Sequence, residues 1–320
     1  MKRLFPRLLP RRSAHLGHPA AATTATGHGE RAPWRQAVRD LLASRTAVAA
    51  MAVLAAIVLA ALLAPWITPQ DPYDLLQLDV LDARLPPLSR SAEGGYLYWL
   101  GTDGQGRDLY SAIVYGLRIS LGVGIGSALV AAAVGTLVGL LAAWLGGRAD
   151  ALLMRLVDLL LSFPTILLAL MILAYLGKGI GNVLLTLVLV EWAYYARTAR
   201  GQALVESRRE YVDAARGQAI GAWRILVGHI LPNCLPPLIV IGTLQVARAI
   251  TLEATLSFLG LGVPITEPSL GLLIANGFQF MLSNEYWISV FPGLALLITI
   301  VAINLVGDRL RDVLNPRLQR

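Results

Sequence analysis

The chain has 320 residues, of which 56% are hydrophobic and only 15% are charged. Soluble globular proteins carry about 25% charged residues, so this composition excludes an ordinary soluble domain and predicts an all-α polytopic membrane protein. The net charge of +7 does not indicate a nucleic-acid partner. The basic residues gather near the two ends of the chain and in one loop, beside apolar segments, where positive charge sets the orientation of a membrane protein.

Residues 1–45 contain nine Lys or Arg against two acidic residues, and they are rich in Ala, Thr, Gly and His. This composition predicts a disordered basic cytoplasmic tail. The first long apolar run, residues 46–66, is the predicted first transmembrane helix. About 20 residues at about 1.5 Å each cross about 30 Å of hydrocarbon. The run lacks the cleavage site of a secretory signal peptide, so we expect it to stay in the mature chain.

Residues 67–118 carry seven acidic residues and four arginines, which predicts a periplasmic segment. Residues 119–308 are predicted to form a core of five further transmembrane helices, with a cytoplasmic loop at 198–235 and a cytoplasmic tail at 309–320. The expected spans of this core are 119–144, 152–176 with a kink at Pro164, 183–195, 236–258 and 287–306. Two glycine pairs in the first of these spans, Gly122/Gly126 and Gly135/Gly139, are spaced for close helix packing.

The distribution of charge favours one topology. Of the 27 Lys and Arg residues, 19 lie in the two tails and in residues 197–235, whereas residues 259–286 hold two acidic residues and no Lys or Arg. Six spans with both termini in the cytoplasm satisfy this pattern. No internal repeat is visible, which weakens the case for a secondary transporter.

Four ionisable residues fall inside the predicted spans: Asp158, Glu191, Arg248 and Glu253. Charge inside a membrane is costly, so such residues face the bundle interior, a water-filled path or a partner. One interpretation is structural pairing between helices, or a position near the membrane interface where charge costs little, and the other is a proton relay or contacts with a substrate. Arg248 and Glu253 are five residues apart, so partners on other helices are as consistent with the sequence as a mutual pair.

The chain shows no sign of catalytic chemistry. Cys234 is its one cysteine, so an internal disulfide is excluded, and its apolar neighbours favour a packing role. The sequence contains no G-x-S-x-G, H-E-x-x-H or G-x-x-x-x-G-K-[ST] motif and no metal-ligand spacing of His and Cys. We predict that the chain is not an enzyme, holds no cofactor or metal, and does not hydrolyse ATP by itself.

The predicted loop contains a polar, helix-prone stretch, residues 210–237, between apolar segments. We expect a helix over 200–216, a break at Gly217 and Gly221, and a second short helix from residue 222 that Pro232 ends. Ala214 and Ala215 are small enough for a partner to approach closely. The stretch fits a helix that docks in a partner's groove, through an apolar ridge of Ile220, Trp223 and Ile225, or a helix that lies on lipid headgroups.

This loop resembles the pattern E-A-A-x-x-x-G-x(9)-I-x-L-P of binding-protein-dependent ABC importer permeases. Residues 213–215, Asp-Ala-Ala, take the first three places, and Leu231-Pro232 take the last two. Ala219 stands at the glycine place, between Gly217 and Gly221, and His229 stands at the isoleucine place. These departures predict a turn that is shifted toward one of the flanking glycines.

Three other stretches resemble the dipeptide, oligopeptide and nickel group of this family. They are LAPWITPQDP at 63–72, LGTDGQGRD at 100–108 and LSFLGLG at 256–262. Their order resembles that of the second, C-type permease of a pair, and the resemblance covers about residues 46–315. The tail before residue 46 lies outside it.

The resemblance implies a six-helix type I ABC importer permease in a bacterial inner membrane. It implies four kinds of partner: a sister permease, two ABC ATPase subunits, a periplasmic or lipid-anchored solute-binding protein, and membrane lipid. The solutes implied are peptides or similar small molecules, nickel chelates among them. The alternatives are a secondary transporter or channel coupled to ions through the four intramembrane charges, and a membrane scaffold. The residues implied in ATPase coupling are Glu210, Asp213, Ala214, Ala215, Gly217, Ala219, Gly221, Trp223, His229, Leu231 and Pro232.

Overall fold

The computed structural model describes residues 39, 41–74, 78–92, 95, 97–264 and 266–314. Most of the predicted tail 1–45, and residues 315–320 of the predicted tail 309–320, lie outside the described residues. The first helix of the bundle, α2 (Arg45–Leu62), begins one residue before the predicted span. Ser44 caps it, because the Ser44 hydroxyl accepts a hydrogen bond from the Ala47 N–H at 3.4 Å.

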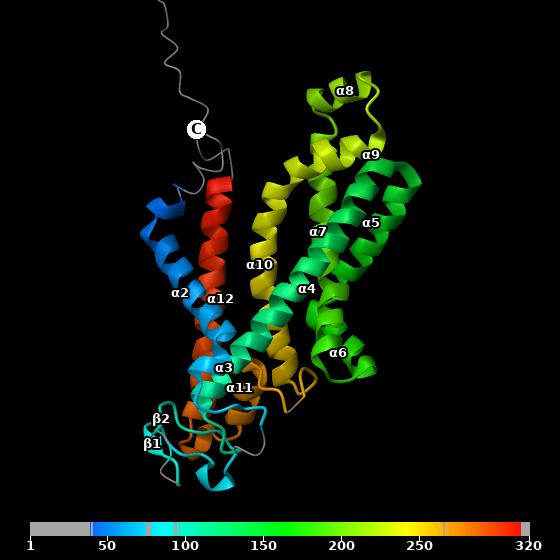
Figure 1. The fold of residues 1–320 in the computed structure, drawn as a ribbon. Helices are drawn as coiled ribbons and strands as arrows, with labels where there is room; N and C mark the ends of the chain where they lie inside the picture. Colours follow the sequence, from blue (N-terminus) through cyan, green and yellow to red (C-terminus); the bar gives the residue numbers. More distant parts are fainter. Residues whose placement is uncertain are drawn as a thin grey trace, which may run out of the picture.

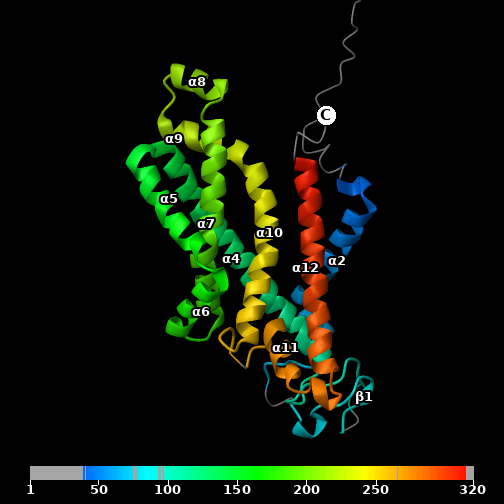
Figure 2. The same ribbon diagram turned by 180° about the vertical axis from the view of Figure 1, so that it is seen from behind.

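Four longer helices complete the bundle: α4 (Leu109–Leu145), α7 (Ile180–Glu206), α10 (Leu231–Phe258) and α12 (Trp287–Leu314). Figures 1 and 2 show α4 crossing the bundle obliquely, with α7 and α10 against it and α2 beside α12. The α4 helix has 37 residues and begins at Leu109, so it extends well before the predicted start at residue 119. The all-α expectation is confirmed, since β1 (Ser89–Arg90) and β2 (Leu97–Tyr98) have two residues each.

Glycines set how closely α4 packs against α7. A Cβ added at Gly135 would overlap the carbonyl oxygen of Trp192, and one added at Gly139 would overlap that of Ala196. The second predicted glycine pair therefore does mediate close packing. In the first pair a Cβ at Gly122 would meet open space, and one at Gly126 would make only an ordinary contact with the Leu184 side chain at 3.4 Å, so this pair does not set a close approach.

A third glycine of α4 marks its crossing with α10. A Cβ added at Gly124 would overlap the side chain of Ile250 on α10. Ile250 is fully buried and belongs to a hydrophobic cluster shared by α2, α4, α10, α11 and α12. The two helices are thus held tightly together at this point.

The predicted span 152–176 is broken into two helices. They are α5 (Gly147–Ser162) and α6 (Thr165–Leu176), and their axes differ by 92°. The break falls at Pro164, as predicted, although the bend is far larger than a kink. Phe163 adopts an extended backbone (φ −86°, ψ 143°), because the proline that follows it disfavours helical geometry.

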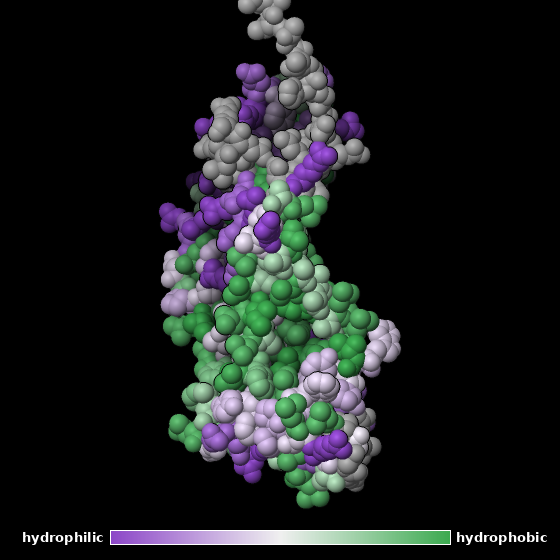
Figure 3. Space-filling model, turned by 90° about the vertical axis from the view of Figure 1, so that its left-hand side faces the viewer, coloured by the Kyte–Doolittle hydropathy of each residue, from purple (hydrophilic) through white to green (hydrophobic). Residues whose placement is uncertain are grey.

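Four helical segments of the described chain are long and apolar enough to cross a membrane, and the bent α5–α6 pair makes a fifth if it counts as one span. The α7 helix has 27 residues, which give it a length of about 40 Å, but its polar residues keep it out of this set. The predicted count of six therefore stays a prediction. Figure 3 shows the apolar band that such spans create across one face of the molecule.

One end of the bundle carries a small lobe, the strand lobe, formed by residues 78–92 and 97–108. Its β1 and β2 pair antiparallel, with Ser89 opposite Tyr98, after a 3₁₀ turn at Val80–Asp82. The predicted loop 259–286 packs against this lobe and contains a helix that the sequence did not predict, α11 (Leu270–Phe278), and a 3₁₀ turn, Met281–Ser283. The Trp287 indole joins the two parts by donating to the Thr102 carbonyl oxygen at 3.4 Å.

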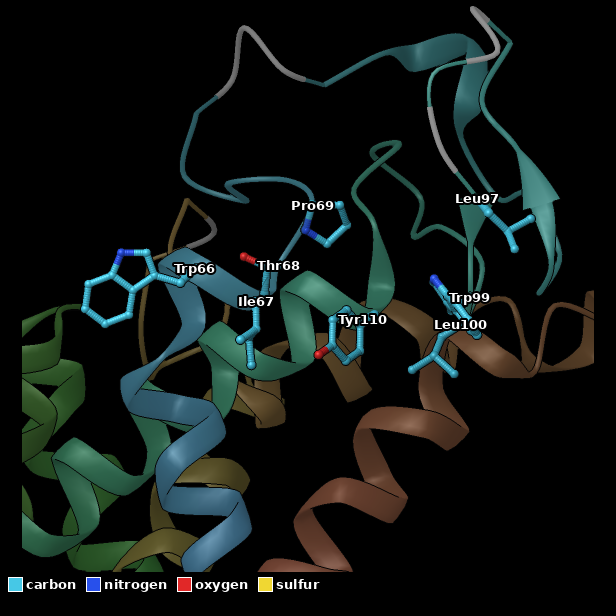
Figure 4. A pocket seen from close by; sticks show the side chains of 8 residues that line it. All are labelled: Trp66, Ile67, Thr68, Pro69, Leu97, Trp99, Leu100 and Tyr110. Carbon is cyan, nitrogen blue, oxygen red and sulfur yellow. The ribbon is translucent and has the colours of Figure 1, made fainter.

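Aromatic side chains mark the junction between the strand lobe and the bundle. Trp66 follows α2 in the short helix α3 (Ala64–Ile67), Trp99 follows β2, and Tyr110 begins α4. All three line an open pocket of about 740 Å³, in which Trp66 points away from the strands (Figure 4). Trp and Tyr are enriched where a membrane meets water, so this level fits one interface of the bilayer.

Candidate coupling site and intramembrane polar residues

The predicted coupling loop projects beyond the bundle at the end opposite the strand lobe (Figure 1). It consists of α8 (Glu210–Gly217), a turn, and α9 (Ala222–Ile225), and we name residues 207–225 the loop tip. Glu210 and Asp213 lie in the first turn of α8 and Arg216 in its last, an order that complements the helix dipole.

The turn that ends α8 is built on Ala219. Its φ is +57°, in the left-handed region, and it is the position at which the loop pattern has glycine. The Ala219 N–H donates to the Arg216 carbonyl at 3.0 Å, and the Ile220 N–H donates to the Ala215 carbonyl at 3.2 Å. These two bonds form a Schellman motif, which usually has glycine at this place. The prediction of a shifted turn is therefore wrong, since Gly221 has φ −58° and Gly217 lies within α8.

The inner face of α8 packs on the rest of the chain. Val212 is fully buried and Ala215 nearly so, in a cluster with residues of α4, α7 and α10. The half-buried Ile220 packs against the same cluster, which supplies the hydrophobic contact typical of a Schellman motif. Ala215 therefore contacts its own chain rather than facing outward, and Ala214 is the exposed small residue of the predicted pair.

Tyr211 ties α8 to both neighbouring helices. Its hydroxyl donates to the Glu206 carboxylate at the end of α7 (2.8 Å) and accepts from the Asn233 amide on α10 (3.3 Å). Burial, followed by the hydrogen bond to Glu206, raises the pKa of Tyr211 to about 12. The phenol therefore stays protonated at neutral pH and remains the donor in this link.

The second helix does not end at Pro232, contrary to prediction. From Ala222 to Phe258 the chain forms one helical run of 37 residues, and we name this run the rod. A π-helical turn, Leu226–Ile230, joins α9 to α10. This wider turn immediately precedes Pro232, and the helix continues through Pro236 and Pro237. His229 lies in the π turn, where its ring is 3.4 Å from the Arg224 carbonyl oxygen.

The predicted coupling residues divide into two groups by exposure. The exposed ones are Glu210, Asp213, Ala214, Gly217, Ala219, Gly221, Trp223 and Pro232. Ala215 is buried, and His229 and Leu231 are partly buried. The predicted ridge is wrong in part, because Ile225 is buried whereas Trp223 is 62% exposed. Val227, one turn after Trp223, is also exposed, and it was not among the predicted residues of the apolar ridge.

Two of the four predicted intramembrane residues are fully buried carboxylates. Glu253 on α10 accepts hydrogen bonds from the Ser120 hydroxyl on α4 at 2.7 Å and from the Ser257 hydroxyl at 2.8 Å. Glu191 on α7 differs, since neither of its carboxylate oxygens has a hydrogen-bond partner among the described residues. It lies within electrostatic range of the Arg248 guanidinium.

The other two predicted residues pair across helices. Asp158 on α5 forms an ion pair with Arg197 on α7. Arg248 on α10 donates to the Thr165 hydroxyl of α6 at 2.9 Å and to the Tyr194 hydroxyl of α7 at 2.8 Å. The Arg248 guanidinium also stacks 4.3 Å from the centre of the Tyr194 ring. Arg248 therefore has its hydrogen-bond partners on other helices and not at Glu253.

Thr165 and Tyr194, the partners of Arg248, and Arg197, the partner of Asp158, were not predicted from the sequence. A signal was present, because Tyr194 and Arg197 are three residues apart on one helix face, as are Arg248 and Thr251. Polar residues that recur at this spacing inside apolar helices indicate one polar face. Considered one at a time, Tyr194 and Arg197 lie at or just past the end of the predicted span 183–195, and Arg248 interrupts the predicted span 236–258.

Residues 100–108, which carry part of the family resemblance, also have structural roles that were not predicted. In the strand lobe, Asp103 and Arg107 form a buried ion pair at 2.8 Å. Asp108 caps α4 by accepting from the Ser111 N–H at 2.8 Å. A Cβ at Gly106, whose φ is +78°, would overlap the backbone of the preceding 3₁₀ turn, so this position requires glycine.

A second buried acid, Asp82, ties the strands together. It accepts hydrogen bonds from the Ala92 N–H at 2.8 Å and the Tyr98 hydroxyl at 2.7 Å. Burial alone would raise the pKa of Asp82, but the bonds from Ala92, Tyr98 and Ser91 outweigh burial and lower it. The carboxylate is therefore held in its charged form at neutral pH.

Two family models match the chain. That of the binding-protein-dependent transport system inner membrane component matches residues 135–320, and that of the N-terminal TM domain of oligopeptide transport permease C matches residues 32–87. A putative peptide transport system permease protein of Brucella suis biovar 1 (strain 1330) is 43% identical over 281 residues, which are 88% of this chain and 91% of that protein. The probable D,D-dipeptide transport system permease protein DdpC of Escherichia coli (strain K12) is 38% identical over 87% of this chain and 89% of its own length.

The fold resembles solved structures of a transporter. An inward-facing structure of the MetNI methionine ABC transporter contains a chain that superposes with a TM-score of 0.53 and 20% identity, over 64% of this chain and 96% of that chain. This likeness confirms the predicted importer-permease fold. It does not favour the ion-coupled alternative. With the family models and the relatives, it shows that the chain is a multi-pass membrane permease rather than an enzyme, and that it belongs to the family of binding-protein-dependent transport system inner membrane components.

Proposed function

We propose that this chain is the C-type permease of an ABC importer for peptides or similar small solutes, and that it forms the translocation pathway with a sister permease. The relatives of known name, at 35–43% identity, include permeases of peptide, dipeptide and glutathione transport systems. A permease of this family implies ATPase and binding-protein partners. The bilayer is the bacterial inner membrane, with both termini on the cytoplasmic side, as the positive charge of the tails favours.

One observation carries the proposed coupling role. The loop tip stands clear of the bundle, and its helix α8 is fixed on one face while its other face is free. The Schellman turn fixes the backbone at the end of α8, and the Tyr211 hydrogen bonds attach α8 to α7 and α10. The loop tip is therefore rigidly attached to the bundle. An ATPase that closes on ATP binding moves the permease only if the surface that it grips is rigidly attached.

The opposite end supplies the surface for the binding protein. On the strand lobe, Val80 and Leu81 are 79% and 81% exposed. Leu282, in the neighbouring 3₁₀ turn, is also fully exposed. Single exposed apolar residues are common on protein surfaces, so these side chains support a docking role for this end only together with the binding-protein partner that the family implies.

Two matched variants test the assignment of the two ends. Ala214→Arg places a charge on the exposed face of α8, and we expect it to lower co-purification of the ATPase subunits by about tenfold or more while membrane insertion is unchanged. Val80→Arg, at the strand lobe, keeps the ATPase and weakens binding of the solute-binding protein. The proposal fails if Ala214→Arg keeps both its ATPases and its transport. Ala215→Glu is a poor test, because it buries a charge within the fold.

A second experiment separates the energy source from the pathway. The purified single chain should hydrolyse no ATP, whereas the complete assembly should couple hydrolysis to uptake. Hydrolysis by the single chain would contradict the proposal. Uptake driven by a proton or sodium gradient without an ATPase would instead support ion coupling.

A further inference from the structure

Four helices, α5, α6, α7 and α10, bring polar residues together at the break between α5 and α6. Asp158 precedes the break and Thr165 follows it. Tyr194 and Arg197 lie on the facing part of α7, and Arg248 reaches both α6 and α7 from α10. The ion pair of Asp158 with Arg197 and the two hydrogen bonds of Arg248 join the helices here. With Thr251, one turn after Arg248, these residues form what we name the polar stripe.

On α6 and α10 the polar stripe lies among exposed side chains that are otherwise apolar, whereas on α5 the exposed Arg155 lies one turn before Asp158. The Asp158 and Arg197 side chains are 64% and 54% exposed. Elsewhere, Leu129 of α4, Leu167 of α6 and Met171 of α6 are exposed instead, as expected of helix faces that contact lipid. A charge that faces lipid is destabilising, so charged side chains inside a membrane turn toward water or a polar partner. The polar stripe therefore faces water or a polar partner.

Arg248 is held so that it retains donors for a ligand. Its ring contact with Tyr194 and its hydrogen bonds to Thr165 and Tyr194 involve neutral groups, and both bonds use Nη2. Among the residues that the structure describes, none accepts a hydrogen bond from its Nη1 or Nε, so these donors remain for another acceptor. Three helices thus fix a partly exposed cation in the middle of the polar stripe, and Glu191 lies within electrostatic range of it without forming a hydrogen bond with it. Such a group binds carboxylates well, because its hydrogen bonds to them are assisted by charge.

We propose that the polar stripe lines the translocation pathway and that Arg248 contacts the carboxylate of the passing solute. This inference rests on the proposed function and names one chemical feature of its substrates, a free carboxylate. Thr165 and Tyr194 are positioning residues, since they orient the guanidinium. The break at Pro164 opens the wall of the pathway at this depth, because it turns α6 away from the line of α5.

Cysteine accessibility tests the exposure of the polar stripe to water. The background is the complete importer in proteoliposomes with Cys234→Ser, which removes the chain's one cysteine. Thr251→Cys introduces a thiol on the polar stripe, and Leu167→Cys is the matched control on an exposed apolar face. A thiol reacts only as the thiolate, which forms in water and not in lipid. We expect a cationic methanethiosulfonate reagent to modify residue 251 at least about tenfold faster than residue 167, with or without ATP. Equal, slow modification of both in each state would overturn the proposal, because lipid or the sister permease would then cover this face.

Transport of a carboxylate pair tests the role of Arg248. Arg248→Gln removes the charge, Arg248→Lys keeps it, and Arg148→Gln removes an exposed charge at the start of α5, well before Asp158. The probes are trialanine and trialanine amide, each at a concentration that saturates the binding protein. We expect Arg248→Gln to slow trialanine uptake by about tenfold and to change amide uptake much less, with partial rescue by lysine.

The outcomes separate this inference from the function on which it rests. If the wild-type assembly shows no ATP-driven uptake of either peptide, the proposed function fails. If the wild type imports trialanine and Arg248→Gln slows both probes equally, or neither, the carboxylate contact is wrong. Co-purification of the ATPases and the melting temperature of each variant show whether assembly is intact.

Discussion

The backbone N–H of Ile220 donates to the carbonyl oxygen of Ala215 at 3.2 Å and closes the end of α8. Between them, Ala219 is held at φ +57°. An L-residue with a Cβ in this region is less stable than glycine by about 1–2 kcal/mol. The turn therefore lies at the place where the loop pattern has glycine, although this chain has alanine there.

Ala219→Gly should stabilise the loop tip by up to about 1 kcal/mol, because glycine adopts this backbone without strain. Slower hydrogen–deuterium exchange at the Ile220 amide is the direct measurement. Gly221→Ala is the control, since Gly221 has φ −58° and open space around it. A reversed result, in which the control perturbs the tip and Ala219→Gly does not, would contradict the assignment of the turn.

Gly139→Ala should destabilise the bundle by about 1–3 kcal/mol, because the added methyl group overlaps the Ala196 carbonyl of α7. Gly122→Ala, on the same helix, meets open space and should be neutral. The melting temperatures of the two variants in one detergent make the comparison. Similar melting temperatures would mean that α4 and α7 are farther apart than the structure shows.

Asp82→Asn should weaken the strand lobe in a manner that depends on pH. The folded-state pKa of Asp82 lies below its ordinary value of 3.8, so its charge adds stability that is fully present above that value. The stability is lost as the pH falls through the lowered folded-state pKa. The difference in melting temperature between wild type and variant should thus be constant from neutral pH to about pH 5 and shrink below pH 4. A difference that grows on acidification would refute the hydrogen-bonded carboxylate.

Glu253→Ala should destabilise the chain by about 1–3 kcal/mol, because it leaves the hydroxyls of Ser120 and Ser257 without their acceptor. Glu253→Gln keeps an acceptor oxygen and should cost less. Melting temperature measures this structural role. If Glu253→Gln kept its stability and lost all uptake, a proton relay would replace the structural interpretation.

Local sequence rules predicted where most of the helices lie, but they did not predict which face of a helix points outward. The break at Pro164 and the packing of Gly135 and Gly139 follow from the chemistry of single residues, so the sequence was enough to predict them. Whether Ala215 or Ala214 faces outward depends on which side of α8 meets α4, α7 and α10, and that is a tertiary contact.

Two other predictions, the end of a helix at Pro232 and a loop without a helix at 259–286, were wrong. Pro232 normally ends a helix, but a π turn before it lets the helix continue. The α11 helix has only nine residues and no long apolar period, so residues 259–286 read as a loop. In both places the neighbouring structure decided the outcome over local propensity.

The rod leads from the loop tip past Arg248 to Phe258 as one helical run, and it bends near its start, where the π turn joins α9 to α10 (Figure 1). Farther along, Ile250 sits so close to Gly124 of α4 that an added Cβ would overlap its side chain. A displacement that enters at the loop tip must therefore pass this tight contact before it reaches Phe258. Arg248 lies two residues before the contact, so it belongs to the part of the rod that is held against α4 and not to an end that is free to move.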